Sequence, residues 1–468
     1  MALGRELLGF LAVILVAASY ARAQEGEDRA KAIGAELREG LERCREHGWS
    51  GVVLVSVGER VLLEEAFGFA DRERERPNTV ETLFPIASLT KQFTAAGIYV
   101  LAKAGKLSLP TSLDACFEGL PPHCRKLQVQ HLLDHRSGID SKIRVPLGAT
   151  REEAVRSYLE HAPQWEPGSQ FEYCNPGYAV LAACIEMRSG QSFDAFCSTT
   201  WFEPFGMTHS GFVGDTKSEP AAVGYQGGTR VRLATEHPYG GPGWHYRGMG
   251  GIVTTARDLW MWMRRGPLQE IAKQSAGSFG YCFGWRQGRT ASGSRKLSHG
   301  GTVAGFTADW RYVPEADQFW VVLSNSGDVP GWVIGDAIES VLQVGRSDSW
   351  PPEQVSWSKD QFEAVTGRYR SEDGAVFDVK PGGRGVALGA VNSKAARVLS
   401  RATVQPTYRL PAYLAVLDFV PIQERRALHY LWSQRTSPEL QFVCGDDNCV
   451  SEFVLSIART QLRATRQR

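Results

Sequence analysis

A serine followed three residues later by a lysine can form an activated nucleophile within one helical turn. Ser88 and Lys91 have this spacing, and an α-helix places residues i and i+3 on the same side. A hydroxyl is a weak nucleophile until a base is held against it, and a neutral lysine can be that base. The N-terminal end of the helix would also stabilise negative charge developing on the Ser88 oxygen. The spacing predicts Ser88 as nucleophile and Lys91 as general base.

The Ser-x-x-Lys spacing alone is weakly specific, because it occurs again at Ser356 and Lys359. Apolar residues flank the first copy at 84–87 and 93–98, whereas a diproline precedes the second. An apolar helix start desolvates Lys91 and lowers its pKa toward the neutral form. The alternative for the first copy is an N-cap serine beside a solvated lysine.

Tyr173 and Asn175 form a second candidate pair. Pro176 disfavours the α-helical conformation for the residue before it, so we expect both side chains to project from a loop ahead of a helix that begins near Gly177. A phenolate beside an ammonium can accept a proton and later return it, and an asparagine amide can bind a substrate carbonyl. The alternative is a packed tyrosine and an asparagine that satisfies backbone groups.

The third candidate segment follows a short predicted strand at 295–298 and consists of His299, Gly300, Gly301 and Thr302. Paired glycines let a ligand approach the backbone without a Cβ clash. An edge strand here could present the Thr302 N–H to a carbonyl oxygen, so that this group and the Ser88 N–H form an oxyanion hole. The alternative is an ordinary turn after a strand.

Taken together, the three segments resemble the serine β-lactamase and penicillin-binding-protein-like hydrolases, in the branch of class C β-lactamases, D-aminopeptidases and related esterases. The segments occur in the order that the family has. Residues 132–139 and 250–259 are similar to two further family segments. The likeness covers roughly 30–345. Two departures are Cys174 in place of the commoner serine and His299 in place of the lysine of penicillin-directed members. His299 is largely neutral at pH 7 if unperturbed, which argues against β-lactam turnover.

The resemblance implies an α+β fold of the β-lactamase and transpeptidase type, with an antiparallel sheet flanked by helices and a helical subdomain over one edge. It implies that Ser88 attacks a carbonyl, that Lys91 with Tyr173 moves the proton, and that water releases the acyl-enzyme. Asn175 and the 299–302 segment would bind substrate. The expected activity is hydrolysis of an ester, an amide or a D-amino-acid peptide bond, with no cofactor and no metal. The alternative is a non-catalytic or merely acylated sensor of cell-wall peptide or β-lactam.

The expected domains are a signal peptide at 1–23, a hydrolase domain at 24–348, a linker at 349–358 and a small β-rich, barrel-like domain at 359–468. Alternating and apolar runs predict the main elements of the hydrolase domain. The predicted helices are 30–47, 88–105, 152–161, 178–188, 255–264 and 333–343, and the predicted strands are 52–57, 61–67, 281–286, 295–298, 307–313 and 319–323.

Charge and the N-terminal segment limit the partners and the location. The chain has 468 residues, with 52 Lys and Arg against 51 Asp and Glu, so the overall charge favours neither nucleic acid nor an anionic membrane surface. A small-molecule or short-peptide substrate is expected. Arg5 precedes an apolar run at 7–18 that is too short to span a bilayer, and Ala21 and Ala23 fit a signal-peptidase site. This predicts a secreted or periplasmic protein without stable membrane insertion.

The nine cysteines allow disulfides in an exported protein, and their odd number leaves at least one thiol free. The first pairs to consider are Cys116 with Cys124 and Cys444 with Cys449, because each pair flanks a short loop. His131 and His135 have the i, i+4 spacing of a zinc helix but lack the glutamate that follows the first histidine, so no metal site is expected. Substrate identity, disulfide connectivity and oligomeric state stay open.

Overall fold

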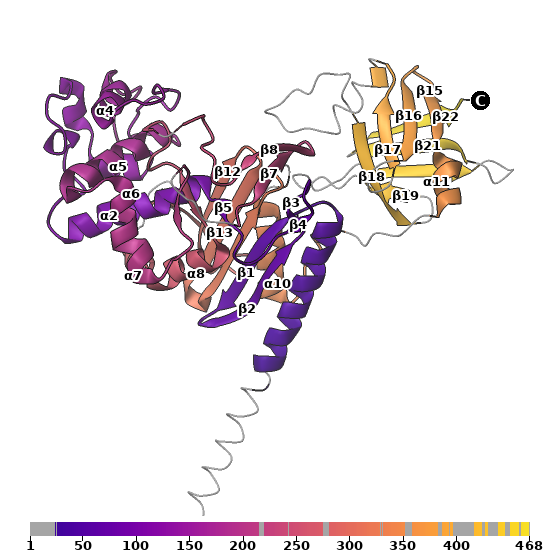
Figure 1. Cartoon of the computed structure of the whole chain (residues 1–468), viewed down its shortest axis with the longest axis horizontal. Helices are drawn as coiled ribbons and strands as arrows, with labels where there is room; N and C mark the ends of the chain where they lie inside the picture. Colours follow the sequence, from indigo (N-terminus) through magenta and orange to yellow (C-terminus); the bar gives the residue numbers. More distant parts are fainter. Residues whose placement is uncertain are drawn as a thin grey trace, which may run out of the picture. The chain divides into compact units, whose positions relative to one another are not determined.

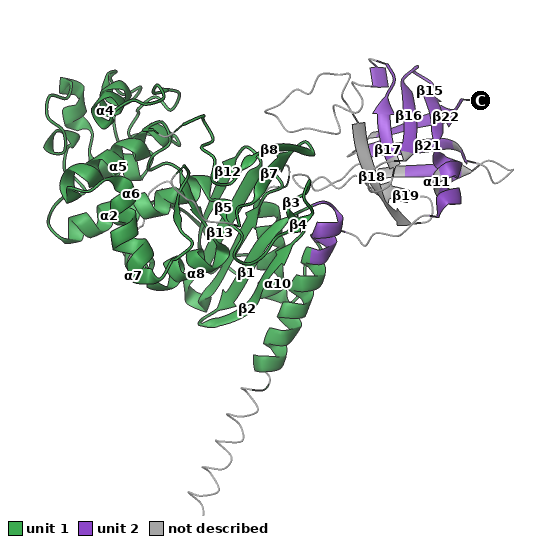
Figure 2. Ribbon diagram, in the orientation of Figure 1, with its two compact units in different colours: residues 1–41, 49–349 green, residues 42–48, 350–468 purple. Residues whose placement is uncertain are grey.

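The computed structural model describes most of the chain. The described residues are 24, 26–214, 220–241, 243–274, 280–327, 329, 331–351, 358–381, 386–392, 394–395, 416–423, 426–428, 439–444, 450–457 and 460–467. Two compact units are present, one formed by Met1–Leu41 and Trp49–Ser349 and the other by Glu42–Gly48 and Trp350–Arg468 (Figure 2). The predicted signal peptide and much of the predicted linker lie outside the described residues.

A seven-stranded antiparallel sheet forms the centre of the first unit (Figure 1). Its order is β10-β11-β12-β13-β14-β1-β2. The first strand of the chain pairs with the last of this unit, since Gly51 lies opposite Ser324. The helical block therefore lies in the sequence between two strands that are neighbours in the sheet. The strands are β1 Gly51–Val57, β2 Arg60–Phe67, β10 Tyr281–Cys282, β11 Trp285–Arg289, β12 Arg295–Val303, β13 Phe306–Val313 and β14 Gln318–Ser324.

Strands β1, β13 and β14 are buried on both faces. Every residue of β13 is buried, and so are all but one residue of β1 and of β14. A strand covered on both faces reads as a continuous apolar run instead of an alternating one. The sequence Val52-Val53-Leu54-Val55 has this pattern and fits its place in the sheet.

Helices cover the sheet and build a separate block beside it, where α2, α4, α5, α6 and α7 gather (Figure 1). One long helix spans residues 26–46. The other elements are α2 Thr90–Lys103, α3 Val129–Leu133, α4 Arg151–Leu159, α5 Asn175–Ser189, α6 Phe193–Cys197, α7 Glu203–Phe205, α8 Ala256–Arg265, α9 Leu268–Gln274 and α10 Gly331–Val344, with the small strands β3 Phe69–Asp71, β4 Arg76–Pro77, β5 Phe84–Pro85, β6 Gly211–Phe212, β7 Val223–Gln226, β8 Thr229–Leu233 and β9 Ile252–Thr254.

Helices α2 and α5 cross closely in the helical block. A Cβ on Gly97 of α2 would lie 2.7 Å from Ile185 Cδ1 and 3.0 Å from a ring carbon of Phe196. A side chain here would push the two helices apart, because interiors are packed at the density of organic crystals. This crossing sets the position of α2 relative to the start of α5.

The second unit is a closed antiparallel barrel of eight strands in its described part, with one short helix, α11 Lys359–Val365. Tyr369, Phe377 and Phe453 pack in its core. The predicted α+β fold with an additional small all-β region is confirmed. The strands are β15 Gly367–Ser371, β16 Val376–Pro381, β17 Val386–Ala390, β18 Val416–Gln423, β19 Arg426–Leu428, β20 Glu439–Cys444, β21 Val450–Ile457 and β22 Thr460–Arg466.

Two predicted strands differ from the structure. The single strand predicted at 281–286 is a tight hairpin, in which β10 and β11 are separated by Phe283 at φ 49° and Gly284 at φ 85°. A Cβ on Gly284 would lie 2.8 Å from the Lys91 carbonyl oxygen, so the close approach to α2 requires the turn. The strand predicted at 295–298 continues to Val303.

One of the cysteine pairs expected from the sequence is wrong in this structure. Cys116 and Cys124 are both free, and the Cys124 thiol donates to the Leu159 carbonyl oxygen at 3.7 Å, toward the end of α4. The other expected pair, Cys444 with Cys449, includes a residue outside the described part of the chain.

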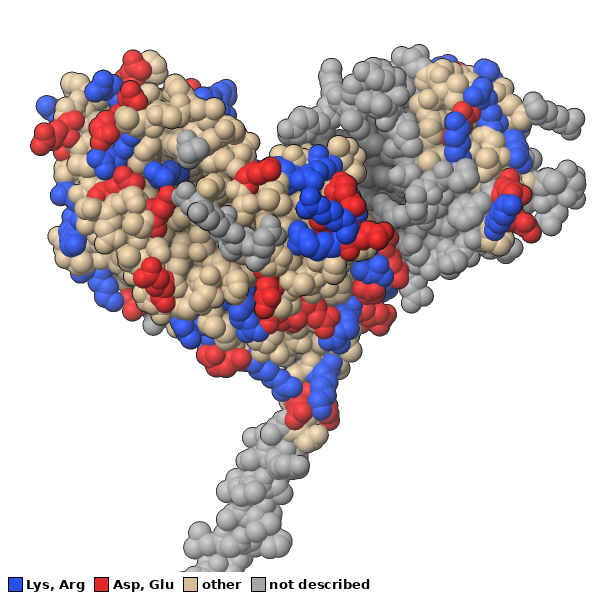
Figure 3. Space-filling view, in the orientation of Figure 1, with Lys and Arg blue, Asp and Glu red and all other residues tan. Residues whose placement is uncertain are grey.

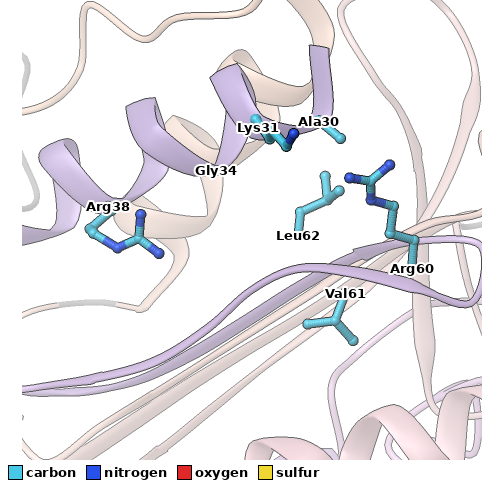
Figure 4. A pocket seen from close by; sticks show the side chains of 7 residues that line it. All are labelled: Ala30, Lys31, Gly34, Arg38, Arg60, Val61 and Leu62. Atoms are coloured by element: carbon cyan, nitrogen blue, oxygen red, sulfur yellow. The ribbon is translucent and has the colours of Figure 1, made fainter. Parts of the chain in front are cut away.

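Acidic and basic side chains are intermixed on the face of the first unit that Figure 3 shows, so this face has no large patch of a single charge. A shallow groove of about 340 Å³ lies between helix 26–46 and the edge strand β2 (Figure 4). The groove lies along β2, which is the edge strand of the sheet farther from β12. None of the described helices is long and apolar enough to cross a membrane. The residues lining the groove are Ala30, Lys31, Gly34, Arg38, Arg60, Val61 and Leu62.

Candidate active site

Ser88 lies in a short 3₁₀ turn, Ala87–Leu89, that leads directly into α2. Ala87 has φ 46°, a left-handed conformation that costs free energy in a residue with a side chain. The strained turn follows β5, which pairs with β9. Because N–H groups in the first turn of a helix have no intrahelical acceptor, the Ser88 N–H is available to a ligand.

Lys91 is fully buried one turn further along and points at the serine. Its Nζ lies 3.1 Å from Ser88 Oγ and donates a hydrogen bond to the Met249 carbonyl oxygen at 2.8 Å. Within the described chain its polar contacts are these two oxygens, so no carboxylate compensates for the loss of water. Burial therefore lowers the pKa of Lys91 well below 10.5, which makes the neutral amine more accessible than in an exposed lysine.

Glycines shape the backbone that receives Lys91. A Cβ on Gly248 would lie 2.6 Å from the Tyr178 carbonyl oxygen, and one on Gly250 would lie 2.3 Å from the Tyr246 ring. Thr94 Oγ1 donates to the Gly248 carbonyl oxygen at 2.7 Å. These glycine contacts thus hold the Met249 carbonyl against the lysine, just ahead of the 250–259 segment that resembles a family segment.

Tyr173 brings its ring over the lysine, with 4.9 Å from Lys91 Nζ to the ring centroid. Its buried hydroxyl forms no hydrogen bond of ordinary length among the described residues, and the Ser88 side chain is the group that offers it one. Burial raises the pKa of Tyr173 to about 12, although the Ser88 hydroxyl and the Arg286 charge oppose the rise. The phenol is therefore protonated at neutral pH.

The His135 ring packs against the ring of Tyr173. Its Nδ1 accepts a hydrogen bond from the Cys174 N–H at 3.0 Å, and its ring centroid lies 4.3 Å from that of Tyr173. His135 has φ 56°, a strained conformation that turns the chain sharply after α3. Burial lowers the pKa of His135 well below 6.5, so the ring packs against Tyr173 without a charge.

Asn175 is exposed and is the first residue of α5. The prediction that the helix begins near Gly177 is wrong by two residues, because Cys174 takes the extended N-cap conformation and Pro176 occupies the first turn. Pro is tolerated there since its missing N–H has no intrahelical role. The Asn175 amide has no hydrogen-bond partner among the described residues.

Strand β12 presents the third segment to Ser88. The pairing of β11 with β12 ends at Ser298, so the edge of β12 from His299 onward is open on that side. Gly300 and Thr302 are exposed, and Gly301 is buried. A Cβ on Gly301 would lie 2.2 Å from the Ile86 carbonyl oxygen. Gly301 therefore allows the strand to approach the turn that carries the serine.

The His299 ring is held inside the protein. Its Nδ1 lies 2.7 Å from the Gly300 carbonyl oxygen, which can only accept, so the proton is on Nδ1. Nε2 then accepts from the Tyr281 hydroxyl at 3.0 Å. Burial, with the nearby Lys91, lowers the pKa of His299 to about 3. Both ring nitrogens are occupied, so the ring positions Tyr281 and the strand, while the backbone beside it faces outward.

Arg286 is a residue that the sequence gave no reason to select. It lies opposite Ser298 on β11, is exposed, and forms no hydrogen bond or ion pair among the described residues. Its charge acts on the pKa values of Tyr173, Tyr281 and His299. Only the strand register brings this guanidinium to the rim of the site, and a sequence alone does not reveal the register.

Comparison with known proteins agrees with this geometry. The sequence model of the family described as Beta-lactamase matches residues 34–338, about two thirds of the chain. The chain belongs to the β-lactamase family. The match includes all three segments that surround Ser88, and membership points to a serine hydrolase. Groups of three or more potential metal ligands are absent from the described residues.

The relatives and structural neighbours include penicillin-binding proteins and a D-amino acid amidase. Penicillin-binding protein 4* of Bacillus subtilis is 32% identical over 35% of this chain and 38% of its own length, so the match spans well under half of that relative. Protein flp of Staphylococcus aureus is 26% identical over 67% of each chain. The octameric penicillin-binding protein homologue of Pyrococcus abyssi has a TM-score of 0.59 and 24% identity, covering 92% of this chain and 99% of its own. D-amino acid amidase of Ochrobactrum anthropi has a TM-score of 0.54 and 22% identity, covering 67% and 98%.

Substitution of the two glycines of β12 tests the contact between this strand and the serine turn. Gly301→Ala should slow the labelling of Ser88 by a fluorophosphonate probe about 100-fold, because small displacements of reacting groups have effects of that order, and should destabilise the unit by about 1–3 kcal/mol through overpacking. The matched control is Gly300→Ala, whose Cβ would meet its nearest neighbour at 3.7 Å. Equal labelling rates in the two variants would contradict the assigned role of Gly301.

Proposed function

We propose that this protein hydrolyses an ester, amide or D-amino-acid peptide bond through an acyl-enzyme on Ser88. The observation that carries the proposal is the buried, uncompensated Lys91 amine 3.1 Å from Ser88 Oγ. A serine that only capped a helix would not require a buried lysine amine beside its hydroxyl. The neutral amine takes the Ser88 proton as Oγ attacks the carbonyl carbon, which converts a weak nucleophile into a strong one.

The oxyanion and the leaving group have separate partners. The Ser88 N–H and a backbone N–H on the open edge of β12, assigned to Thr302, hold the oxyanion that forms. Tyr173, protonated at neutral pH, lies beside Ser88 and Lys91 and passes the proton to the leaving group as the acyl-enzyme forms. Water then attacks the acyl-enzyme, with the same groups acting in reverse. Asn175 is placed to bind a substrate carbonyl from the start of α5.

Turnover of a chromogenic ester tests the reaction. The intact protein should release product continuously, and Ser88→Ala should reduce the rate at least 1000-fold, because the nucleophile is lost. A variant of another serine outside the site, Ser292→Ala, is the control, since Ser292 lies in the exposed turn after β11. A stoichiometric burst without turnover in the intact protein would instead support a sensor that is acylated and not released.

The pH profile tests the assignment of the base. The neutral form of Lys91 is active, so kcat/KM should fall as the pH drops through the Lys91 pKa and should reach a plateau on the acid side of pH 10.5, where ordinary lysines are still charged. Tyr173 has a pKa of about 12, so its ionisation should not affect kcat/KM at the pH values of the acid limb or the plateau. Lys91→Met should abolish the acid limb together with most of the activity. A rate that keeps rising through pH 10.5 would show that Lys91 is not desolvated as described.

We further propose that the substrate carries a carboxylate near the scissile bond, bound by Arg286 at the rim. The buried, neutral His299 does not supply a positive charge, whereas Arg286 is exposed and without a partner among the described residues. An arginine binds a carboxylate with two parallel hydrogen bonds. The proposed preference is therefore for anionic peptides or esters over neutral ones.

A pair of arginines on β11 tests this preference. Arg286→Ala should raise KM about tenfold for a carboxylate-bearing peptide ester, as expected for a loss of about 1.4 kcal/mol, and should leave a neutral ester of the same acyl group unaffected. Arg289→Ala is the matched control, because Arg289 is exposed on the same strand and donates to the Gly293 carbonyl oxygen away from the site. Equal losses for both substrates in Arg286→Ala would contradict carboxylate binding.

A further inference from the structure

Tyr281 is a buried side chain to which the proposed reaction assigns no role. It is one of the two residues of β10. Its ring centroid lies 4.5 Å from that of His135 and 6.1 Å from that of Tyr173. The centroid of the His299 ring lies 5.6 Å away on the third segment. Tyr281 therefore packs against both of the segments that flank Ser88.

The backbone of Tyr281 is held in place by the turn that follows it. Phe283 and Gly284 both have positive φ, and a Cβ on Gly284 would lie 2.8 Å from the Lys91 carbonyl oxygen. The turn is thus pressed against the start of α2, close to the serine along the chain. Because β10 pairs only with β11, this turn and the packing of Tyr281 determine where β10 lies.

The Tyr281 hydroxyl begins a short chain of hydrogen bonds. It donates to His299 Nε2 at 3.0 Å, and His299 Nδ1 donates to the Gly300 carbonyl oxygen at 2.7 Å. The ring is neutral, because burial lowers the pKa of His299 to about 3. A neutral imidazole carries its proton on one nitrogen and accepts at the other. The tyrosine proton therefore favours the tautomer that holds Gly300.

Gly300 lies where β12 has lost one of its two neighbouring strands. The pairing with β11 ends at Ser298, and from there to Val303 the strand pairs with β13 alone. A glycine backbone is also freer than that of any other residue. The hydrogen bond from His299 restrains this stretch, two residues before the Thr302 N–H that is assigned to the oxyanion.

We propose that Tyr281 is a positioning residue, which fixes the tautomer and orientation of His299 and thereby holds the backbone of β12 from Gly300 to Thr302 in one conformation beside Ser88. The inference rests on the proposed acylation of Ser88. Tyr281 acts through His299 and the strand, and no bond to it forms or breaks in the reaction. Its effect on the rate arises because an oxyanion donor must point at the place where the charge develops.

Tyr281→Phe in the full chain tests this role, because it removes the hydroxyl and keeps the ring. The labelling of Ser88 by a fluorophosphonate probe should slow about tenfold, as expected when one hydrogen bond that supports the transition state is lost. The matched control is Tyr312→Phe. Tyr312 is a buried tyrosine of the neighbouring strand β13, and its hydroxyl donates to Asp317 Oδ1 at 3.2 Å. This control should be labelled at the rate of the intact chain.

Nitrogen-15 NMR of the histidine rings gives a readout that a packing role would not change. In the intact chain, Nδ1 of His299 should have the signal of a protonated nitrogen and Nε2 that of an acceptor, and His299→Gln identifies both signals by their loss. In Tyr281→Phe the donor to Nε2 is gone, so the tautomers should mix and the two signals should move toward each other. Tyr312→Phe should leave both unchanged. The melting temperature of Tyr281→Phe should fall by roughly 2–4 °C, and labelling is measured well below it.

The outcomes separate this inference from the proposed function. Unchanged His299 signals in Tyr281→Phe, or a proton on Nε2 in the intact chain, would overturn the role of Tyr281 even if Ser88 is labelled. Equal labelling rates in Tyr281→Phe and the intact chain would overturn it as well. If the probe fails to label Ser88 in the intact chain, the proposed acylation is wrong and the positioning role is wrong with it, whatever the His299 signals show.

Discussion

The contact between a buried amine and a serine hydroxyl is the constraint on which the rest of this fold depends. An isolated ammonium in an apolar interior is costly, so the lysine is stable there only if it loses its charge or gains a partner. Lys91 has a carbonyl acceptor from Met249 and the faces of Tyr173 and Tyr178 at 4.9 and 5.6 Å. These groups satisfy one N–H and exclude water without supplying a negative charge. The result is an amine of lowered pKa beside a hydroxyl, and the lowering comes from packing and not from an ion pair.

Glycines make that packing possible at three separate points. Gly301 brings β12 against the Ile86 carbonyl, Gly284 brings the β10–β11 turn against the Lys91 carbonyl, and Gly248 brings the loop before β9 against α5. Each would place a Cβ within 3 Å of a backbone oxygen. The site is therefore assembled by backbones in contact, which are stiffer than side chains and hold the reacting atoms in place.

The sequence predicts the elements near the serine well, because their signals are local. The hairpin of β1 and β2, helix α2 and helix α8 follow from apolar periodicity and turn residues. The errors occur where distant contacts decide the conformation. Phe283 adopts a positive φ because the following glycine must approach α2, and Asn175 joins a helix whose start is fixed by Cys174 and His135. The position of Arg286 also depends on strand register, which a single sequence does not encode locally.

The distribution of charge links the site to the choice of substrate. Burial lowers the pKa values of Lys91, His135 and His299, and Tyr173 keeps its proton. In the reaction that we propose, the oxyanion is held by backbone N–H dipoles, which favour an oxyanion without attracting anions in general. Among the described residues that act on these groups, the positive charge in contact with solvent is at the rim, on Arg286. In the function that we propose, selection of an anionic substrate and stabilisation of the oxyanion are thus assigned to different atoms, so a change at the rim should alter specificity while the pKa of Lys91, set by burial, is retained.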